Sequence, residues 1–536
     1  MGNLYFGDNL DILRNEIRDE SVDLIYLDPP FNSKRGYNVY LPTPKGQESD
    51  AQVMAFEDTW HWGEQAETEF AELLHQPNTD VAEMIQSLRR FLKESDMMAY
   101  LVMMANRLVE LHRVLKPTGS LYLHCDPTAS HYLKIVLDTV FGAQNFRNEI
   151  VWQRTNVHSD SKTWSAVCDN ILFYTKTDSF TWNAIYLPHS EEHIGSKYKN
   201  IDETGRRYTL SDMTSPNPRP NMMYEWKGFP YPPNGWRYSK ETMRKLDSER
   251  RIWYPDDKNK RPRLKRYLDE MSGTLVTTVW TDINPINSQA QERLGYPTQK
   301  PLALLERIIK SSSNEGDVIM DPFCGCGTAI HASQTLKREW IGIDITHLAV
   351  SLIEKRMRDA FPGIQFDVHG TPKDLGGARD LAERDKYQFQ WWACSLVNAQ
   401  PYQGKKKGSD GGIDGVIFFQ DDEKEAKKIV VSVKGGEHVN VTMVKDLIAT
   451  VEREKAEIGL FIALAEPTKP MQTEAVSAGF YESQFGAFPK IQILTIEDLL
   501  SGKEKPKYPD LSRGGLSFKK AKVEKRKASQ NKMDGF

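Results

Sequence analysis

The sequence predicts an α/β protein built on a mostly parallel β-sheet with helices on both faces. Two parts of the chain alternate near-continuous apolar segments, typical of fully buried parallel strands, with segments of helical periodicity. The first part ends near residue 151, and the alternation returns at Leu302. Between them, from about Thr155 to Ala290, a stretch rich in Pro, Asn, Trp and Tyr indicates an inserted module of loops.

The individual elements follow from this alternation. In the first part the strands are NLYFGD, VDLIYLD and SLYLHCD, and the helices are the periodic segments that begin at Met97 and Ala129. The second part gives a helix from Leu302, the strand DVIMDPF, the helix TAIHASQTLK and the strand EWIGIDI. After a break near DLGGARDLAE, a third region carries its own strands: GVIFF, KIVVSVK, IGLFIAL and IQILTI.

Composition limits the classes of protein that fit. The 536 residues suggest several domains, and 39% hydrophobic and 27% charged residues are typical of a soluble protein. No apolar run is long enough to span a membrane, the N-terminus lacks the pattern of a signal peptide, and five scattered cysteines do not make a disulfide framework. We therefore expect a cytoplasmic protein without a membrane partner.

The formal net charge of −4 restricts any contact with nucleic acid to local basic patches. Residues 237–266 carry 12 Lys or Arg against 5 Asp or Glu, and residues 519–532 carry 7 against 1. Such cations would contact phosphates and supply affinity without sequence information. The tryptophans and tyrosines in the first run are individually more typical of a small core.

A glycine-rich turn, DPFCGCGT, spans Asp321 to Thr328 between an apolar strand and a helix. Gly325 and Gly327 would let the backbone approach a ligand, and the helix N-terminus beyond them offers free N–H groups. The next strand ends at Asp344, 17 residues after Gly327, where an acid can bind both hydroxyls of a ribose. The spacing is shared by dinucleotide sites and S-adenosylmethionine sites; without a ligand it would be a tight turn.

The strand VDLIYLD ends on Asp28 and is followed at once by Pro29, Pro30 and Phe31. A site that methylates an exocyclic amine must accept hydrogen bonds from it, because the nitrogen lone pair is conjugated with the base. Asp28 offers a carboxylate acceptor, and the prolines fix a backbone whose carbonyl can accept the second hydrogen. Phe31 offers a flat face for a flipped base. Alone, this would be an ordinary turn; together with the glycine-rich turn it favours methyl transfer.

Five motifs, in order, resemble those of the β group of amino-directed DNA methyltransferases, with a Type III Mod-like arrangement: GDNLDIL, VDLIYLDPPFN, NEIVWQR, YPTQKP and DPFCGCGT. The resemblance covers about Met1 to Pro372. It implies the S-adenosylmethionine-dependent methyltransferase fold, a single doubly wound sheet assembled from residues 1–151 and 295–372. It also implies that residues 152–294 are a target-recognition region that reads double-stranded DNA, and that the protein is a homodimer.

The resemblance also assigns roles to residues. It implies that Asp8 lies near the adenine of S-adenosylmethionine, that Asp344 holds the ribose, and that Tyr296–Pro301 flanks the methionine end. The Asp-Pro-Pro-Phe form favours adenine N6 as the target, because members directed at cytosine more often begin with Ser. The predicted catalytic residues are Asp28, Pro29, Pro30 and Phe31; the predicted cofactor-binding residues are Asp8, Thr298, Lys300, Pro301, Asp321, Phe323, Gly325, Gly327, Thr328 and Asp344.

The third region, residues 385–502, places Asp414 before one strand and Lys434 at the end of another. This is the frame of many nucleases, in which the carboxylate binds Mg²⁺ and the lysine orients water. The region resembles the Mrr-like branch of the PD-(D/E)xK restriction-endonuclease fold, which implies that Gln390 faces the site. Ser432 departs from that pattern, because it stands where the family has Glu, Asp or Gln, and a hydroxyl is a poor Mg²⁺ ligand. A degenerate nuclease fold or a plain salt bridge is the alternative.

These patterns together predict a site-specific DNA methyltransferase that acts on adenine N6 within a restriction-modification or defence context. Three alternatives stay open: a cytosine N4 target, a Mg²⁺-dependent endonuclease acting through the third region, and a catalytically idle DNA-binding subunit. The expected partners are double-stranded DNA, a second copy of the chain and a separate restriction or defence subunit. Residues 503–536 are predicted to be a basic, disordered tail.

Overall fold

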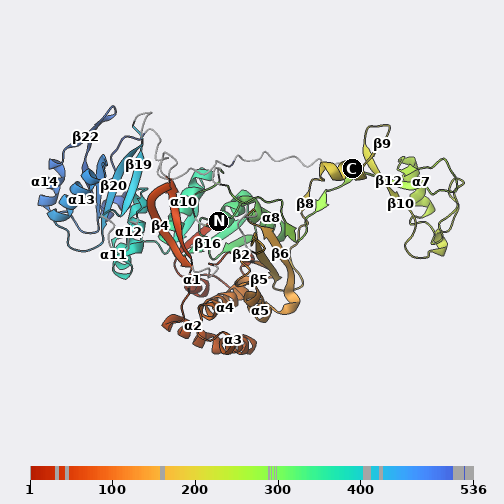
Figure 1. Ribbon diagram of the computed structural model, residues 1–536, viewed down its shortest axis with the longest axis horizontal. Coiled ribbons are helices and arrows are strands. Elements are labelled where there is room, and N and C mark those ends of the chain that lie inside the picture. The colour runs from red at the N-terminus through yellow and green to blue at the C-terminus, as the bar shows by residue number, and fades with distance from the viewer. Residues whose placement is uncertain are drawn as a thin grey trace. The chain divides into compact units, whose positions relative to one another are not determined.

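The structure is a computed structural model that separates the chain into two compact units (Figure 1). One unit comprises residues 1–183 and 278–536, and the other is Ala184–Thr277. The structure describes residues 2–30, 35–42, 48–58, 60–156, 163–287, 290, 292–294, 296, 298–402, 412–421, 426–510 and 524, with the backbone alone for 35–58.

The larger unit is organised around a nine-stranded sheet in the order β14-β6-β7-β5-β2-β15-β16-β1-β17. Every neighbouring pair is parallel except those that involve β7, which runs antiparallel to β5 and β6. In the middle of the sheet, β2 from the first segment pairs with β15 from the second, which confirms a single mostly parallel sheet built from two segments. The bounds are β1 (Gly2–Phe6), β2 (Val22–Leu27), β5 (Leu115–Cys125), β6 (Phe146–Gln153), β7 (Cys168–Thr175), β14 (Val279–Trp280), β15 (Val318–Asp321), β16 (Glu339–Asp344) and β17 (Phe366–His369).

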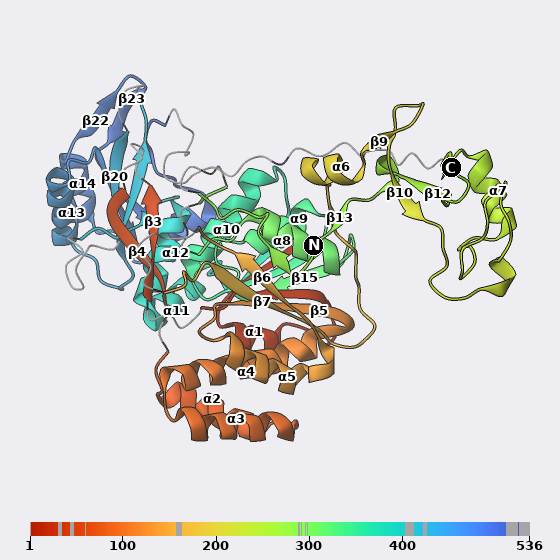
Figure 2. The same ribbon diagram turned by 45° about the vertical axis from the view of Figure 1, so that its right-hand side comes forward.

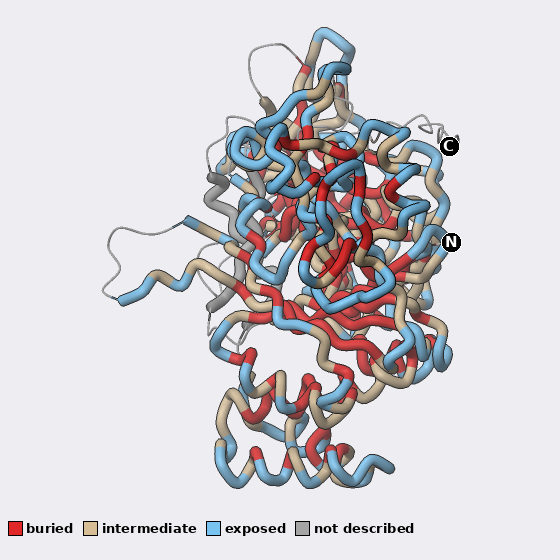
Figure 3. The backbone as a smooth tube through the Cα atoms, turned by 90° about the vertical axis from the view of Figure 1, so that its right-hand side faces the viewer, coloured by how far each residue is buried: buried red, intermediate tan, exposed pale blue. Residues whose placement is uncertain are grey.

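Helices cover both faces of this sheet (Figure 2). One face carries α1 (Asn9–Asn15), α4 (Asp96–Val114) and α5 (Ser130–Phe141), and α2 (Glu64–Leu74) and α3 (Thr79–Leu92) lie outside α4. The other face carries α8 (Leu302–Ser312), α9 (Thr328–Thr335) and α10 (His347–Ala360). The central strands β7, β5, β2 and β15 are mostly buried (Figure 3), as their apolar sequences require, whereas the edge strands β14 and β17 are partly exposed. No helix in the described part of the chain combines the length and apolarity needed to cross a bilayer.

The region predicted as an insertion, residues 152–294, divides differently in the structure. Both β7 and β14 belong to the central sheet, and the separate unit is the narrower range Ala184–Thr277. The run Ile171–Thr175 is buried in the sheet. Its apolar sequence indicates a strand, but the sequence around it is typical of loops, and the strand was therefore missed. The unit itself holds α7 (Lys240–Ser248) and a four-stranded sheet of β11 (Ile252–Trp253), β12 (Arg263–Tyr267), β10 (Arg207–Asp212) and β9 (Asn200–Ile201).

The C-terminal part of the larger unit has a second sheet, in the order β18-β19-β20-β21-β24. The four strands expected from sequence are present as β19 (Gly415–Phe419), β20 (Lys427–Lys434), β21 (Ile458–Ala463) and β24 (Ile491–Thr495). The segment expected as a break is instead α11 (Leu375–Arg384), because Asp374 caps the amide of Gly377 and Leu381 packs into the core. The remaining elements are α12 (Lys386–Leu396), β18 (Gln400–Pro401), α13 (Val441–Arg453), α14 (Lys469–Ser477), the antiparallel pair β22 (Phe480–Ser483) and β23 (Gly486–Pro489), and α15 (Ile496–Ser501).

Candidate active site

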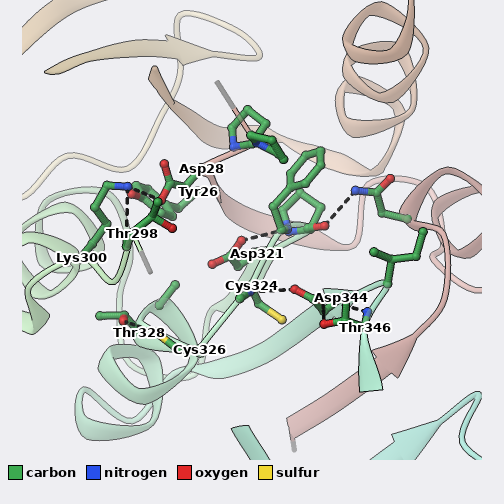
Figure 4. A pocket seen from close by; sticks show the side chains of 18 of the residues that line it. Tyr26, Asp28, Thr298, Lys300, Asp321, Cys324, Cys326, Thr328, Asp344 and Thr346 are labelled. Atoms are coloured by element: carbon green, nitrogen blue, oxygen red, sulfur yellow. Dashed lines mark hydrogen bonds and ion pairs between the residues drawn. The ribbon is translucent and has the colours of Figure 1, made fainter. Parts of the chain in front are cut away.

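A cavity of about 260 Å³ lies at the carboxyl ends of β2, β15 and β16 (Figure 4). Parallel strands present their carboxyl ends at one edge of the sheet, so polar residues that follow different strands meet there. The predicted residues that line this cavity come from both sequence segments: Asp8, Asp28, Pro29, Pro30, Thr298, Lys300, Asp321, Phe323, Gly325, Thr328 and Asp344.

The Asp28 carboxylate is held on one side only. Its Oδ2 forms an ion pair with the ammonium group of Lys300, whose side chain is 9% exposed and also lies 3.4 Å from the carbonyl of Thr298. Its Oδ1 is buried and has no hydrogen-bond partner among the described residues. Buried polar atoms in native proteins are normally paired, so an unpaired acceptor that belongs to a cavity-lining residue indicates a place for a donor from a ligand.

The glycine-rich turn requires its two central glycines. Gly325 has a φ of +50°, and a Cβ there would lie 3.2 Å from the ring of Tyr296. Gly327 has a φ of +72° and is the N-terminal cap of α9, and a Cβ there would meet Ile353 at 2.8 Å. Thr298, in the segment beside this turn, also has a positive φ, +61°, which is rare for a residue with a side chain and recurs at functional sites. The turn therefore packs tightly against the Tyr296–Pro301 segment.

Two acids accept hydrogen bonds from backbone amides of the glycine-rich turn. Asp344 accepts hydrogen bonds of 2.9 Å from the amide of Gly325 and from the amide and hydroxyl of Thr346. Burial raises the pKa of Asp344 to about 6, although those donors act against the rise. Burial also holds the pKa of Asp321 well above its usual range, so its neutral form is favoured; its Oδ1 accepts from the Phe323 amide at 3.0 Å. The cavity lining thus includes two acids, Asp321 and Asp344, whose burial favours the neutral form.

Asp8 belongs to a network that the sequence did not reveal. It caps α1 through the amide of Leu10 and receives two hydrogen bonds, of 3.0 and 3.1 Å, from Arg107 on α4. Arg107 also donates to Asn9 at 2.6 Å, and Asn9 donates to the carbonyl of Pro322 at 2.9 Å. These bonds connect α1 and α4 to the glycine-rich turn. In the sequence, the only indication of this network was that Arg107 is a charged residue within an apolar part of α4.

Two predicted residues do not line the cavity. Pro301 precedes α8 as its N-terminal cap, and Gly327 precedes α9 as its N-terminal cap. Phe31 lies outside the described residues. Lining residues that sequence reasoning missed include Tyr26, Trp60 and Met103, which come from β2, from the segment before α2 and from α4.

The acid of the C-terminal domain has a different environment. Asp414 is 8% exposed, and its Oδ2 accepts from the amide of Val433 at 2.6 Å and from the hydroxyl of Ser432 at 3.5 Å. Among the described residues, no group of three His, Cys, Asp or Glu side chains could hold a metal ion, so the Mg²⁺ expected at Asp414 finds no support. Lys434 ends β20, and Gln390 lies on α12, which packs against β20.

The glycine-rich turn and the acid that ends the next strand border a cavity at the carboxyl edge of an α/β sheet. A family model described as DNA methylase matches residues 22–355, well over half of the chain. The chain belongs to this DNA methylase family. A second family model, described as NACHT-associated inactive Restriction Endonuclease 1, matches residues 394–500.

Individual relatives agree with this family. The chain is 32% identical over 261 residues to the Type II methyltransferase M.EcaI of Enterobacter cloacae, which covers 48% of this chain and 57% of the relative. It is 27% identical over 351 residues to the Mod subunit of the Type III restriction-modification enzyme StyLTI of Salmonella typhimurium, 62% of this chain and 50% of the relative. The chain thus spans about half the length of these relatives. The solved cytosine-N4-specific PvuII DNA methyltransferase is 12% identical, with a TM-score of 0.32, over 66% of this chain and 86% of that one.

Proposed function

We propose that the chain is a DNA methyltransferase that moves a methyl group from S-adenosylmethionine to the exocyclic N6 amine of adenine in double-stranded DNA. The observation that carries the proposal is the buried, unpartnered Oδ1 of Asp28, a residue that lines the cavity at the carboxyl edge of the sheet. A carboxylate oxygen there can accept one hydrogen of the amine, while Lys300 holds the other oxygen and fixes the direction of the carboxylate.

The residues around the cavity fit the cofactor. S-adenosylmethionine supplies a methyl group on a sulfonium sulfur, and in our proposal the glycine-rich turn and the Tyr296–Pro301 segment hold it. Asp344 would bind the ribose, because its carboxylate lies at the edge of the cavity beside Gly325. Asp8 would lie at the adenine end, where Arg107 holds it rigidly. The aligned transfer then depends on orientation more than on acid–base power.

The DNA would be bound in part by the unit Ala184–Thr277. Its aromatic residues divide into two roles: Trp236 is fully buried in the unit's core, whereas Tyr231 is 51% exposed. Cations lie over rings, as with Arg206 on Tyr267 at 3.8 Å and Lys258 on Phe229 at 3.9 Å. Arg206 also pairs with Asp269 and Glu270, so the support for phosphate contacts comes instead from residues 237–266, with 12 Lys or Arg against 5 Asp or Glu. The affinity of such contacts would fall steeply with salt.

The wider assembly is also part of the proposal. The StyLTI relative is a Mod subunit of a restriction-modification enzyme, and this supports a separate restriction subunit as a partner. We propose a homodimer as the form that binds DNA. The match of residues 394–500 to an inactive endonuclease family supports a C-terminal domain that does not cut DNA.

Mapping modified bases in DNA tests the target. The wild-type chain and Asp28→Ala are each expressed in a host that lacks its own DNA methyltransferases, and the genomic DNA is sequenced with detection of methylated bases. We expect N6-methyladenine at one recurring sequence with the wild type and none with the variant. N4-methylcytosine would correct the target base, and the absence of any modified base would contradict the proposed activity.

A further inference from the structure

Three buried side chains behind the cavity form a hydrogen-bonded chain that the proposed site does not yet use. The hydroxyl of Tyr26 lies 2.9 Å from Nδ1 of His124, and Nε2 of His124 lies 3.1 Å from Oδ2 of Asp169. All three are at most 2% exposed, and they come from the adjacent strands β2, β5 and β7. Tyr26 also lines the cavity, two residues before Asp28 (Figure 4).

The positions of the hydrogens on these three side chains follow from the ionisation of Asp169. Burial alone would raise the pKa of Asp169, but the hydrogen bond from His124 and the charges of His124, Lys300 and Arg154 hold it below its usual value. Arg154 also pairs with Asp169 at 2.9 Å. An ionised carboxylate only accepts, so Nε2 of His124 carries a hydrogen. In the tautomer that carries its hydrogen on Nε2 alone, Nδ1 accepts the hydroxyl hydrogen of Tyr26, whose oxygen keeps lone pairs for another donor.

Methylation of an amine requires the removal of a proton, which these three hydrogen-bonded side chains can accept. When the amine nitrogen bonds to the methyl carbon it becomes a cation that still carries two hydrogens, and it must lose one of them as a proton. Asp28 already has one oxygen on Lys300 and, in the proposed function, the other on the amine. A second acceptor near Asp28 would let the carboxylate stay charged throughout the reaction, and Tyr26 lines the same cavity two residues before Asp28.

We propose that Tyr26, His124 and Asp169 form a proton relay for the methylated amine, an inference that rests on the proposed function. The nitrogen–hydrogen bond breaks as the oxygen of Tyr26 takes that proton, and the original hydroxyl proton of Tyr26 moves to Nδ1 of His124. The positive charge passes from the base to the imidazolium of His124, where the carboxylate of Asp169 stabilises it. After product release the proton returns by the same route to the opened cavity and the solvent.

The sheet provides a matched control. Tyr122 on β5 is the cross-strand partner of Tyr26 and is equally buried, at 1% exposure. Its hydroxyl pairs with Ser312 at 2.7 Å instead of with a histidine, and it does not line the cavity. Tyr26→Phe and Tyr122→Phe therefore each remove one buried hydroxyl from neighbouring positions of the same core, and only the first interrupts the relay.

The test is single-turnover transfer of a labelled methyl group to duplex DNA, in H₂O and in D₂O, with S-adenosylmethionine affinity and thermal unfolding measured in parallel. We expect Tyr26→Phe to lower the rate constant about 100-fold, at the lower end of general acid–base effects, without weakening cofactor binding. Tyr122→Phe should leave the rate unchanged. The wild type should be slower in D₂O than in H₂O, and Tyr26→Phe should lose most of that difference.

Asp169→Asn keeps the shape of the side chain but removes the charge that would stabilise the imidazolium, so it should slow transfer as Tyr26→Phe does. Equal rates in Tyr26→Phe and Tyr122→Phe, or a solvent isotope effect that Tyr26→Phe retains, would overturn the relay while the methyltransferase proposal stands. A wild-type chain that transfers no methyl group would contradict the proposed function, and the relay would fall with it.

Discussion

Two regions of the chain carry an acid next to a strand and a lysine expected to act with it, and they differ in how the acid is used. Asp28 keeps one buried oxygen without a partner in the described structure, beside a cavity, and its other oxygen pairs with Lys300. Asp414, which sequence pattern joins to Lys434, accepts the backbone amide of Val433. An acid at a strand end is a candidate for ligand binding when one of its oxygens has no partner in the protein. It has a structural role when that oxygen accepts a hydrogen bond from a backbone amide.

The largest expected effect is at Asp28. Asp28→Ala removes the acceptor for the amine and should lower methyl transfer by about 1,000-fold, the upper range for the loss of one preorganised hydrogen-bonding group. S-adenosylmethionine binding should be unchanged, because the glycine-rich turn and Asp344 remain. Transfer of labelled methyl groups and equilibrium binding measure the two effects. The matched variant Asp414→Ala should transfer at the wild-type rate, and wild-type turnover by Asp28→Ala would end the assignment.

The second effect is at the lysines. Lys300→Met removes the ion pair that orients Asp28 and should cost about 100-fold in transfer, the size expected when a reacting group is misplaced by about an ångström. Lys434→Met should change neither transfer nor the integrity of DNA incubated with Mg²⁺. Steady-state kinetics and gel analysis of the DNA measure these outcomes. Cleavage by the wild type that Lys434→Met loses would contradict the contrast between the two pairs.

The third effect is on stability. Asp414→Ala leaves the buried amide of Val433 without its acceptor, so the free energy of unfolding of the C-terminal domain should fall by about 1–3 kcal/mol. Hydrogen exchange of the β20 amides, measured by mass spectrometry across a denaturant series, reports this domain. An unchanged unfolding midpoint would show that the Asp414 bond is not part of the scaffold.

The smallest expected effect is the pH dependence of cofactor binding, which depends on Asp344 in the same cavity as Asp28. The pKa of Asp344 is raised to about 6, so its carboxylate is ionised above that pH and protonated below it. Protonation weakens its bonds to Gly325 and Thr346 and to a ribose, so the dissociation constant for S-adenosylmethionine should rise as pH falls from 7 to 5, by about tenfold at most per pH unit. Asp344→Asn should bind more weakly at pH 7 and lose this dependence. A flat profile in the wild type would remove Asp344 from the cofactor site.

Much of the scaffold could be predicted because it depends on local pattern. The four main strands of the C-terminal sheet coincide with continuous apolar runs, and α4 coincides with its periodic segment. The segment of α11 was missed because Gly376 and Gly377 suggest a break, whereas the cap at Asp374 and the packing of Leu381 stabilise a helix there.

The site could be predicted only in part, for a related reason. Asp28, Asp321 and Asp344 were found because each follows or ends an apolar strand, a feature visible along the chain. The Asp8–Arg107 pair joins residues 99 positions apart, and the Lys300–Asp28 pair joins residues 272 apart. No local pattern determines which oxygen of Asp28 stays without a partner. That property comes from the packing of two distant segments around one cavity.

A structure of the chain with duplex DNA and a non-reactive analogue of S-adenosylmethionine tests the central claim most directly. We predict a flipped base whose amine nitrogen lies about 3 Å from Oδ1 of Asp28, with Oδ2 still paired to Lys300. An amine that binds elsewhere in the cavity, with Oδ1 of Asp28 still unpartnered or bonded to protein alone, would contradict the account.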